Sequence, residues 1–394
     1  MMKKTQAALA ALLLSGAIAL PAGAAPAAPI LIQVDGQLLE LAGRNPVESN
    51  GTVFVPLRPV LQKLGIQVTY DLATGAIRGS KGTQTFKLQI GSTQGTVNGQ
   101  VRELAAAPRS IKGAVYVPAS FISETWGGRV EWDAEDRAVL ITSADTAKAE
   151  PEMKAFFEKY AGAVNRNDFD AILSLFVPGS DLARALTAKR EEVTANGQQL
   201  KLEQAHIVRA EANEIIVHTI EYTHITSGPF KPDSRSENTY RIVRQGDQGW
   251  AIANAQITGI QYLVSDEQLQ ASVTVPEADQ KAIAQQLKAN FDAANAEDLT
   301  AFLATVDASS ADLEQMKQKY SNLFRTYDIT YSLETAKIIS YDGTNAAVYA
   351  IQTAKKRKGP AFEDNRAATV TTVKKNAAGE WKLLQTYVLD AEKL

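Results

Sequence analysis

Apolar residues along the first third of the chain are spaced in some segments as in a β-strand and in others as in an α-helix. Val53–Val55 is a β-branched and aromatic run typical of a strand. Val60 and Leu64 then fall on one face of a short helix, which Gly65 is well placed to end. Val68 begins a second alternating run. The pattern predicts the order strand, short helix, strand.

This pattern occurs twice. Val53-Phe54-Val55-Pro56 returns as Val115-Tyr116-Val117-Pro118, at an offset of 62 residues (117 minus 55). Upstream, Val34-Asp35-Gly36-Gln37 returns as Val97-Asn98-Gly99-Gln100, at an offset of 63 (99 minus 36). Repetition at a fixed spacing indicates a duplicated structural element. Residues 30–142 are therefore predicted to form one α+β module with two internal repeats.

The first repeat resembles that of the copper amine oxidase N-terminal domain family, also called stalk domains. The resemblance is carried by Val55-Pro56-Leu57-Arg58, Gly65, Val68 and the aromatic-Asp pair Tyr70-Asp71. The second copy departs from it, with Ser120 in place of Arg58 and Trp126 in place of leucine. The resemblance implies a small fold rather than oxidation. In the oxidases the copper and quinone centre lies in another domain, built on three histidines and a tyrosine in an Asn-Tyr motif.

That motif is missing here, because Tyr240 follows Thr239 and the sequence has no His-x-His pair. We therefore expect no cofactor. With no cysteine in 394 residues, the chain also lacks thiolate metal sites, disulfides and a lipid-anchor cysteine.

A second pair of repeats follows. A helix predicted over Pro151–Asn165 carries Phe156 and Phe157 on one face, and Pro276–Asn295 repeats it. Asp168 and Asp298 are each placed to cap a second helix, and long strand patterns follow. Later matches, such as Trp250 with Trp381, keep an offset of 131 residues (381 minus 250).

Helices followed by long hairpin strands resemble the nuclear transport factor two-like superfamily, the SnoaL-like cone of curved sheet wrapped on helices. This implies an α+β fold class: a repeat-built stalk-like module followed by two cone-like domains. The boundaries predicted are 151–263 and 276–394 for the two domains. Residues 143–150 and 264–275 are predicted to be linkers.

The N-terminus predicts export. Lys3 and Lys4 precede an apolar run from Ala7 to Leu20, and small residues follow up to Ala24, which is the order of a secretory signal peptide over residues 1–24. The run is shorter than the roughly 20 apolar residues that a spanning helix needs. No later stretch is a membrane-span candidate, so we expect a secreted or extracellular protein. Association with the cell wall is a further hypothesis.

The three histidines, His206, His218 and His224, all fall in the first cone-like domain. His218 and His224 are six residues apart on one strand, roughly 20 Å, which is too far to share a metal. If the chain turns near Ala212, His206 and His218 face one another across two strands. A two-histidine metal site or a pH-sensitive pair is one interpretation, and structural histidines are the other. We expect no metal site.

Alternation places His218, Tyr222 and His224 on one face of their strand, with Ile216 and Ile220. If that face looks into the cone, these three side chains are polar groups in an apolar ligand pocket. The alternative is a sheet face that simply packs on helices.

Four cations, Lys355, Lys356, Arg357 and Lys358, precede Gly359-Pro360 at a predicted hairpin tip. They are a candidate contact for an anionic polymer, or a solvated tip that Glu363 and Asp364 partly neutralise.

The remaining composition narrows the function. The formal charge of −3 gives no case for nucleic-acid binding. Neither a Gly-x-Ser-x-Gly elbow nor a glycine-rich phosphate loop occurs, and we assign no catalytic residue. The sequence favours an exported, non-enzymatic binding or scaffolding protein whose partner is an unknown envelope or cell-wall component. The alternative is a small-molecule-binding protein or enzyme that uses the pocket of the first cone-like domain.

Overall fold

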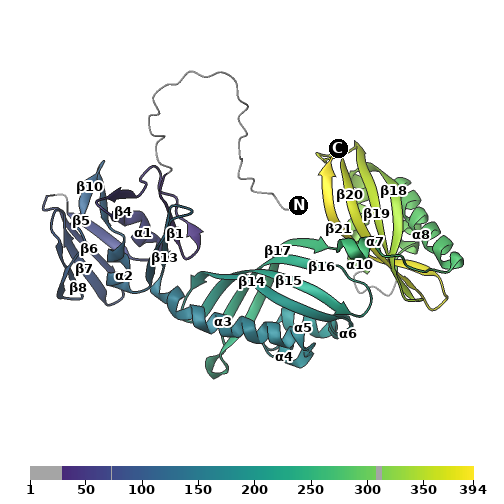
Figure 1. Cartoon of the computed structure of the whole chain (residues 1–394), viewed down its shortest axis with the longest axis horizontal. Helices are drawn as coiled ribbons and strands as arrows, with labels where there is room; N and C mark the ends of the chain where they lie inside the picture. The colour runs from purple at the N-terminus through teal and green to yellow at the C-terminus, as the bar shows by residue number, and fades with distance from the viewer. Residues whose placement is uncertain (1–28, 72, 308–312) are drawn as a thin grey trace, which may run out of the picture.

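Three units follow one another along the chain in this computed structural model, which describes residues 29–71, 73–307 and 313–394. The N-terminal module (residues 30–142), unit A (144–263) and unit B (276–394) lie in a row, with unit A in the middle (Figure 1). The chain is α+β, and strands predominate. The predicted signal segment 1–24 lies outside the described residues. Within those residues, no helix is both long enough and apolar enough to cross a membrane.

The N-terminal module contains three small sheets, with strand orders β12-β13-β1-β2, β10-β11-β4-β3 and β5-β6-β7-β8-β9. Its elements are β1 (Leu31–Val34), β2 (Gln37–Leu38), β3 (Val47–Ser49), β4 (Thr52–Pro56), α1 (Leu57–Lys63), β5 (Gln67–Asp71), β6 (Ala76–Lys81), β7 (Gln84–Gln89), β8 (Gln94–Val97), β9 (Gln100–Glu103), β10 (Arg109–Ile111), β11 (Ala114–Pro118), α2 (Ser120–Trp126), β12 (Arg129–Asp133) and β13 (Ala138–Thr142).

Both halves of the module have the predicted order of strand, helix and strand. β4 and β11 pair antiparallel, and Val55 lies directly opposite Val117, both without solvent exposure. The glycines predicted to end the helices, Gly65 and Gly127, have φ values of 71° and 76°. A non-glycine residue is disfavoured at such left-handed positions. The hydrophobic core lies between the sheets and the two helices.

The connection to unit A corrects one prediction. α3 (Ala144–Asn165) begins directly after β13, so residues 143–150, predicted as a linker, are helical except for the cap Ser143. Pro151 lies inside this helix rather than at its first turn. Its missing N–H removes the hydrogen bond to the carbonyl of Ala147. Burial of Thr146 and Ala149 before the proline, continuous with the apolar face after it, favours helix on both sides.

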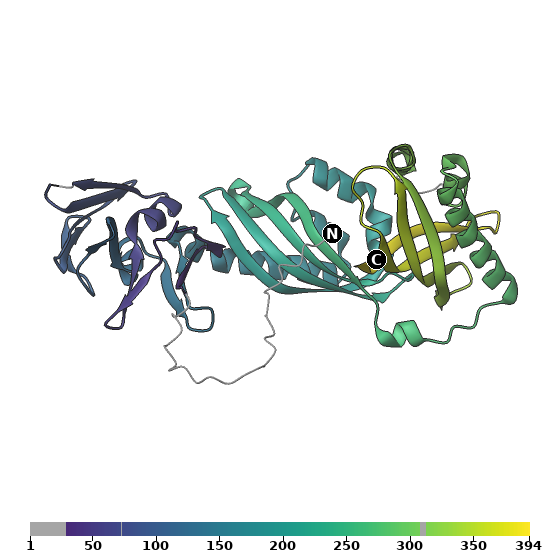
Figure 2. The same ribbon diagram turned by 90° about the horizontal axis from the view of Figure 1, so that it is seen from above.

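Unit A packs its helices on one face of a four-stranded antiparallel sheet with strand order β14-β15-β16-β17. The strands run obliquely past α3, which lies along the sheet (Figure 2). The elements after α3 are α4 (Phe169–Leu173), α5 (Asp181–Ala188), α6 (Arg190–Thr194), β14 (Gly197–Ala210), β15 (Glu214–Ser227), β16 (Asp233–Arg244), the 3-10 turn η1 (Gly246–Gln248) and β17 (Trp250–Leu263).

Unit B also places helices before a four-stranded sheet, with strand order β18-β19-β20-β21. Its elements, with α7 in the connector, are α7 (Asp266–Gln270), α8 (Glu277–Asn295), α9 (Leu299–Ala304), α10 (Leu313–Thr326), β18 (Asp328–Tyr341), β19 (Asn345–Lys358), β20 (Asn365–Lys375) and β21 (Trp381–Lys393). The helix predicted over Pro276–Asn295 thus begins one residue later, at Glu277.

Units A and B share local contacts at matching positions. Asp168 and Asp298 cap α4 and α9 through the N–H groups of Ala171 and Ala301, at 3.0 and 2.9 Å. At the end of each long helix, an asparagine side chain exchanges two hydrogen bonds with the backbone of the first strand. Asn165 bonds Leu200 in unit A, and Asn295 bonds Tyr331 in unit B. These clamps fix the helix against the strand.

Each unit also ties its long helix to the start of its last strand. The indole N–H of Trp250 donates to Glu152, and that of Trp381 donates to Asp279. A cation, Arg244 in unit A and Lys375 in unit B, pairs with the same carboxylate and lies over the indole ring. Three hydrogen bonds, from Tyr341, Lys375 and Trp381, lower the pKa of Asp279 to about 2.

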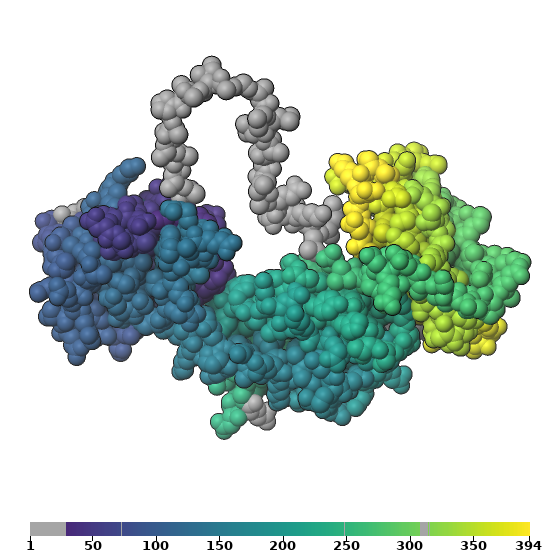
Figure 3. Space-filling model, in the orientation of Figure 1, coloured from purple at the N-terminus to yellow at the C-terminus, as the bar shows by residue number. Residues whose placement is uncertain are grey.

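The connector between units A and B is packed rather than free. Residues 264–275 include α7, and Val264 and Leu269 cover the outer face of the unit B sheet at Ala347 and Val370. Phe230, from the β15–β16 loop of unit A, packs there too. The space-filling view shows continuous surface from the N-terminal module through unit A to unit B (Figure 3).

Candidate functional site

The predicted pocket residues lie on the solvent side of the unit A sheet. Along β15, Ile215, Val217, Thr219 and Glu221 are buried toward the helices, whereas His218, Tyr222 and His224 are half-buried or exposed on the other face. The inward orientation on which the predicted pocket depended is therefore wrong. Both faces of β15 carry isoleucines, so alternation defined the two faces but did not identify the inner one.

Two of these side chains join a third at the end of the β15–β16 hairpin. The hydroxyl of Tyr222 donates to Asp233 at 2.8 Å, and Nδ1 of His224 lies 2.8 Å from the same carboxylate oxygen. The N–H of Ile225 donates to the other oxygen. Burial raises the pKa of Asp233, but these hydrogen bonds outweigh it and leave the pKa below its usual value. The arrangement holds the hairpin together.

His218 has a different partner. His206 and His218 are directly opposite on β14 and β15, as predicted, and their ring centroids are 5.2 Å apart. Burial, and then the charge of His218, lower the pKa of His206. Among the described residues, no group of three or more His, Cys, Asp or Glu side chains is placed to hold a metal ion.

His206 also meets the N-terminal module. A Cβ added at Gly36, in the β1–β2 turn, would lie 3.0 Å from Cδ2 of His206. A cleft of about 340 Å³ opens beside this contact, with Asp35 and Gly36 on one side and Lys154 and His206 on the other. The contact therefore joins two units.

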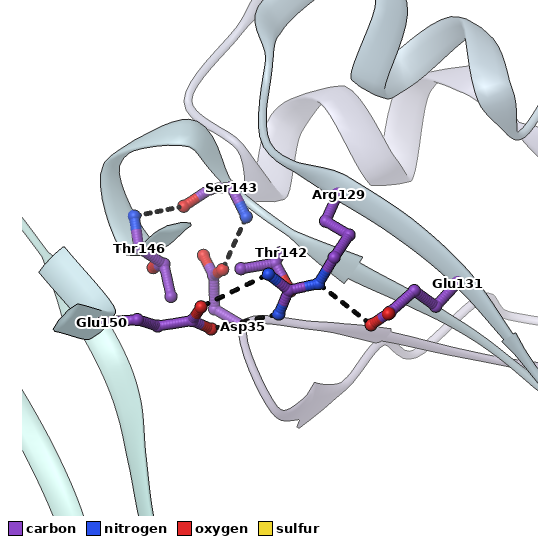
Figure 4. A network of polar contacts seen from close by, with 7 residues as sticks. All are labelled: Asp35, Arg129, Glu131, Thr142, Ser143, Thr146 and Glu150. Atoms are coloured by element: carbon purple, nitrogen blue, oxygen red, sulfur yellow. Dashed lines mark hydrogen bonds and ion pairs between the residues drawn. The ribbon is translucent and has the colours of Figure 1, made fainter. Parts of the chain in front are cut away.

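Figure 4 shows the polar network that holds the same junction. Arg129 on β12 donates to Glu150 on α3 through both terminal nitrogens at 3.3 Å, and its Nε donates to Glu131 at 3.0 Å. Oδ1 of Asp35 accepts the N–H of Ser143 at 2.8 Å, and the hydroxyl of Ser143 accepts the N–H of Thr146. A bidentate guanidinium-carboxylate pair restricts orientation as well as distance. The network sets the direction in which α3 leaves the module.

Sequence reasoning missed a buried carboxylate on the inner face of unit A. Glu221 is 5% exposed and accepts hydrogen bonds from Thr219 at 2.7 Å and Tyr240 at 2.9 Å. Burial raises the pKa of Glu221. Burial, with the Glu221 carboxylate, also raises the pKa of Tyr160 to about 12. The sequence did contain an indication of this site, because Glu221 continues the alternating row of Ile215, Val217 and Thr219 on one face of β15.

Unit B has no acid at the position that matches Glu221. At the offset of 131, the position of Glu221 is Gln352 and that of Tyr240 is Thr371, whose hydroxyl lies 3.0 Å from that of Thr386. A cleft in unit B lies away from this position. A space of about 470 Å³ between α8, α9, α10 and β21 is lined by Phe302, Tyr320 and other side chains.

The four predicted polymer-contact cations lie at the end of β19, next to the predicted hairpin tip. Lys356 and Lys358 lie opposite Ile329 and Asp328 of β18, and the pairing is irregular at Arg357 between them. Nζ of Lys356 donates to the carbonyl of Pro360. Lys356 is half-buried, and the other three cations are exposed.

Comparisons with known proteins give one curated relative. A protein named "Protease inhibitor" from Brevibacillus choshinensis is 28% identical over 203 residues. The match covers 50% of this chain and 59% of that protein, so the chain spans about three fifths of the relative's length.

Several solved structures are similar to part of the chain. A cystatin-like protein of unknown function from Nostoc punctiforme is 17% identical, with a TM-score of 0.26, over 29% of this chain and 93% of its own. A putative dehydratase of the NTF2-like family from Streptomyces avermitilis is 15% identical, with a TM-score of 0.25, over 30% and 99%. These similarities are too low to support statements about this chain.

Two family models match separate regions. Residues 285–394, which begin within α8 and include the whole sheet of unit B, match the anti-sigma-I factor RsgI9 C-terminal domain. Residues 33–141 match the copper amine oxidase N-terminal domain. The second match confirms, for the N-terminal module, the family resemblance predicted from its repeated Val-Pro motifs.

Proposed function

We propose that this chain is an exported, non-enzymatic binding or scaffolding protein of the cell envelope or extracellular space. The N-terminal module is its docking piece, and units A and B are two cone-like domains that arose by duplication. The observation that carries the proposal is the ordered junction in which Arg129 and Asp35 of the module hold the start of α3. A protein that only tethers its domains has no need of a fixed angle between them.

The comparisons support binding rather than a particular partner. The matched family models name an N-terminal module and an anti-sigma factor C-terminal domain. The curated relative is named as a protease inhibitor, so a secreted protease is one partner to test. The duplication is supported by the matching asparagine clamps and aspartate caps of units A and B.

Binding to isolated envelopes tests the proposal. Purified protein is mixed with washed envelope fragments at low and high salt, sedimented and quantified in both fractions. We expect the protein in the pellet, and a contribution from Lys355 to Lys358 would appear as salt-sensitive loss. Protein that stays in the supernatant at every salt concentration contradicts envelope binding.

A second candidate function is small-molecule binding on the inner face of unit A. It is favoured by Glu221, a buried carboxylate held by Thr219 and Tyr240, because such groups often orient a ligand in an apolar site. Native mass spectrometry of purified protein tests it. A bound small molecule that is lost in Glu221→Gln supports this function, and an unliganded mass in both proteins contradicts it.

A further inference from the structure

The N-terminal module contains a cleft of about 270 Å³ that is separate from the sites above. It lies where the end of β4 and the start of α1 meet β5 and the β10–β11 turn. Its walls are largely apolar: Leu57 and Ile77 are buried, and Pro59 and Val68 are half-buried.

Two arginines, Arg44 and Arg58, also line this cleft. Both are exposed, and no ion pair or side-chain hydrogen bond engages either guanidinium within the described part of the chain. No acidic side chain among the described residues lines the cleft. By contrast, Arg129 of the same module pairs with both Glu131 and Glu150. Two unneutralised guanidiniums beside an apolar hollow favour an oxyanion, because their planar forks match carboxylate and phosphate groups.

The walls restrict which oxyanion fits. The volume is at the lower end for small-molecule sites, so it holds an end group rather than a long segment. A chain of phosphodiesters presents polar atoms along its length and would leave Leu57, Val68 and Ile77 without apolar contacts. A carboxylate attached to small apolar residues satisfies both the arginines and the walls. Tyr70, which is half-buried at the cleft, adds a hydroxyl for hydrogen bonding.

We propose that this cleft binds the free C-terminal carboxylate of a peptide that ends in small apolar residues. The inference rests on the proposed docking role of the N-terminal module and specifies its chemistry. Arg58 belongs to the first internal repeat, and the corresponding position in the second repeat is Ser120. The site therefore exists once per module, although the fold element occurs twice.

The test measures binding of three soluble probes to the purified protein by calorimetry: N-acetyl-alanyl-alanine, its C-terminal amide and glycerol 3-phosphate. We expect the free acid to bind and the amide to bind about tenfold or more weakly, the loss expected for one charge-assisted hydrogen bond. Arg58→Ala and Arg44→Ala should each cause a similar loss. Arg102→Ala, on β9 and outside the cleft, is the matched control.

Several results would overturn the proposal: equal binding of acid and amide, no binding of either, unchanged binding in Arg58→Ala, or preferential binding of glycerol 3-phosphate. Arg58→Lys, which keeps the charge but loses the fork, should retain part of the affinity and guards against misfolding of the alanine variants. Envelope sedimentation of the same variants separates the two proposals. If the wild type sediments but binds no peptide, the docking role stands and the carboxylate site does not.

Discussion

The contact between Gly36 and His206 gives a sharp test of the junction between the N-terminal module and unit A. Gly36 and Gly99 occupy equivalent turns in the two internal repeats, with φ values of 73° and 80°. A Cβ at Gly99 would meet nothing within 4 Å, whereas one at Gly36 would lie 3.0 Å from His206. Gly99→Ala is therefore a matched control for Gly36→Ala.

Both substitutions place alanine in the left-handed region, at a cost of about 1–2 kcal/mol. Gly36→Ala must also displace the ring of His206, and an off-rotamer side chain costs about 0.5–1.5 kcal/mol. We thus expect Gly36→Ala to be the more destabilising by about 1 kcal/mol, and only this variant should loosen the junction.

Hydrogen exchange measured by mass spectrometry distinguishes the two effects. Gly36→Ala should speed exchange in both the β1–β2 turn and the middle of β14, whereas Gly99→Ala should affect its own turn alone. In a double-mutant cycle, adding His206→Ala to Gly36→Ala should remove much of the extra destabilisation of Gly36→Ala relative to Gly99→Ala, because residues in contact have non-additive effects. Equal exchange of β14 in the two glycine variants would refute a docked junction.

Three further predictions concern units A and B. The pKa of Asp279 is lowered from 3.8 to about 2, so the stability that this carboxylate contributes is present above pH 3.8 and is lost as the pH falls toward 2. In Asp279→Asn, this part of the acid dependence of the unit B melting temperature should be absent. Burial raises the pKa of Glu221, so the ionisation of this side chain destabilises unit A as the pH rises above 4.5. Glu221→Gln should reduce the fall of the melting temperature with rising pH. An unchanged pH dependence would contradict burial of a titrating acid. In urea unfolding, Asn165→Ala should lower the free energy of unfolding of unit A by about 2–3 kcal/mol. Asn295→Ala, at the more exposed clamp, should lower that of unit B by about 1 kcal/mol. The control Asn213→Ala, at an exposed turn, should change neither value.

Much of the local structure was predictable because it depends on neighbouring residues. Gly65, with its positive φ, and Asp168, with its capping carboxylate, are set by their own segments. The facing of His206 and His218 followed from equal distances to a turn. The pairing of Val55 with Val117 is a contact between the two repeats, and the sequence predicted the repeats but not this pairing.

The errors arose where tertiary packing decides. Pro151 is ordinarily a first-turn residue, and burial of Ala149 on the same face as Met153 extended the helix through it. The inner face of β15 depends on which side α3 covers, which no residue of β15 encodes. Arg44 and Arg58 are 14 residues apart (58 minus 44) and meet at one cleft through the folding of the β2–β3 connection, so no spacing rule links them.

The central claim is that the chain acts outside the cytoplasm. Identifying the N-terminus of the protein in each cell fraction tests this claim most directly. Cells producing the intact gene product are separated into cytoplasmic, envelope and medium fractions, and the protein in each is identified by mass spectrometry of its N-terminal peptide. The account predicts a chain beginning at Ala25 in the envelope or medium. A chain that retains Met1 to Ala24 and remains in the cytoplasm would contradict it.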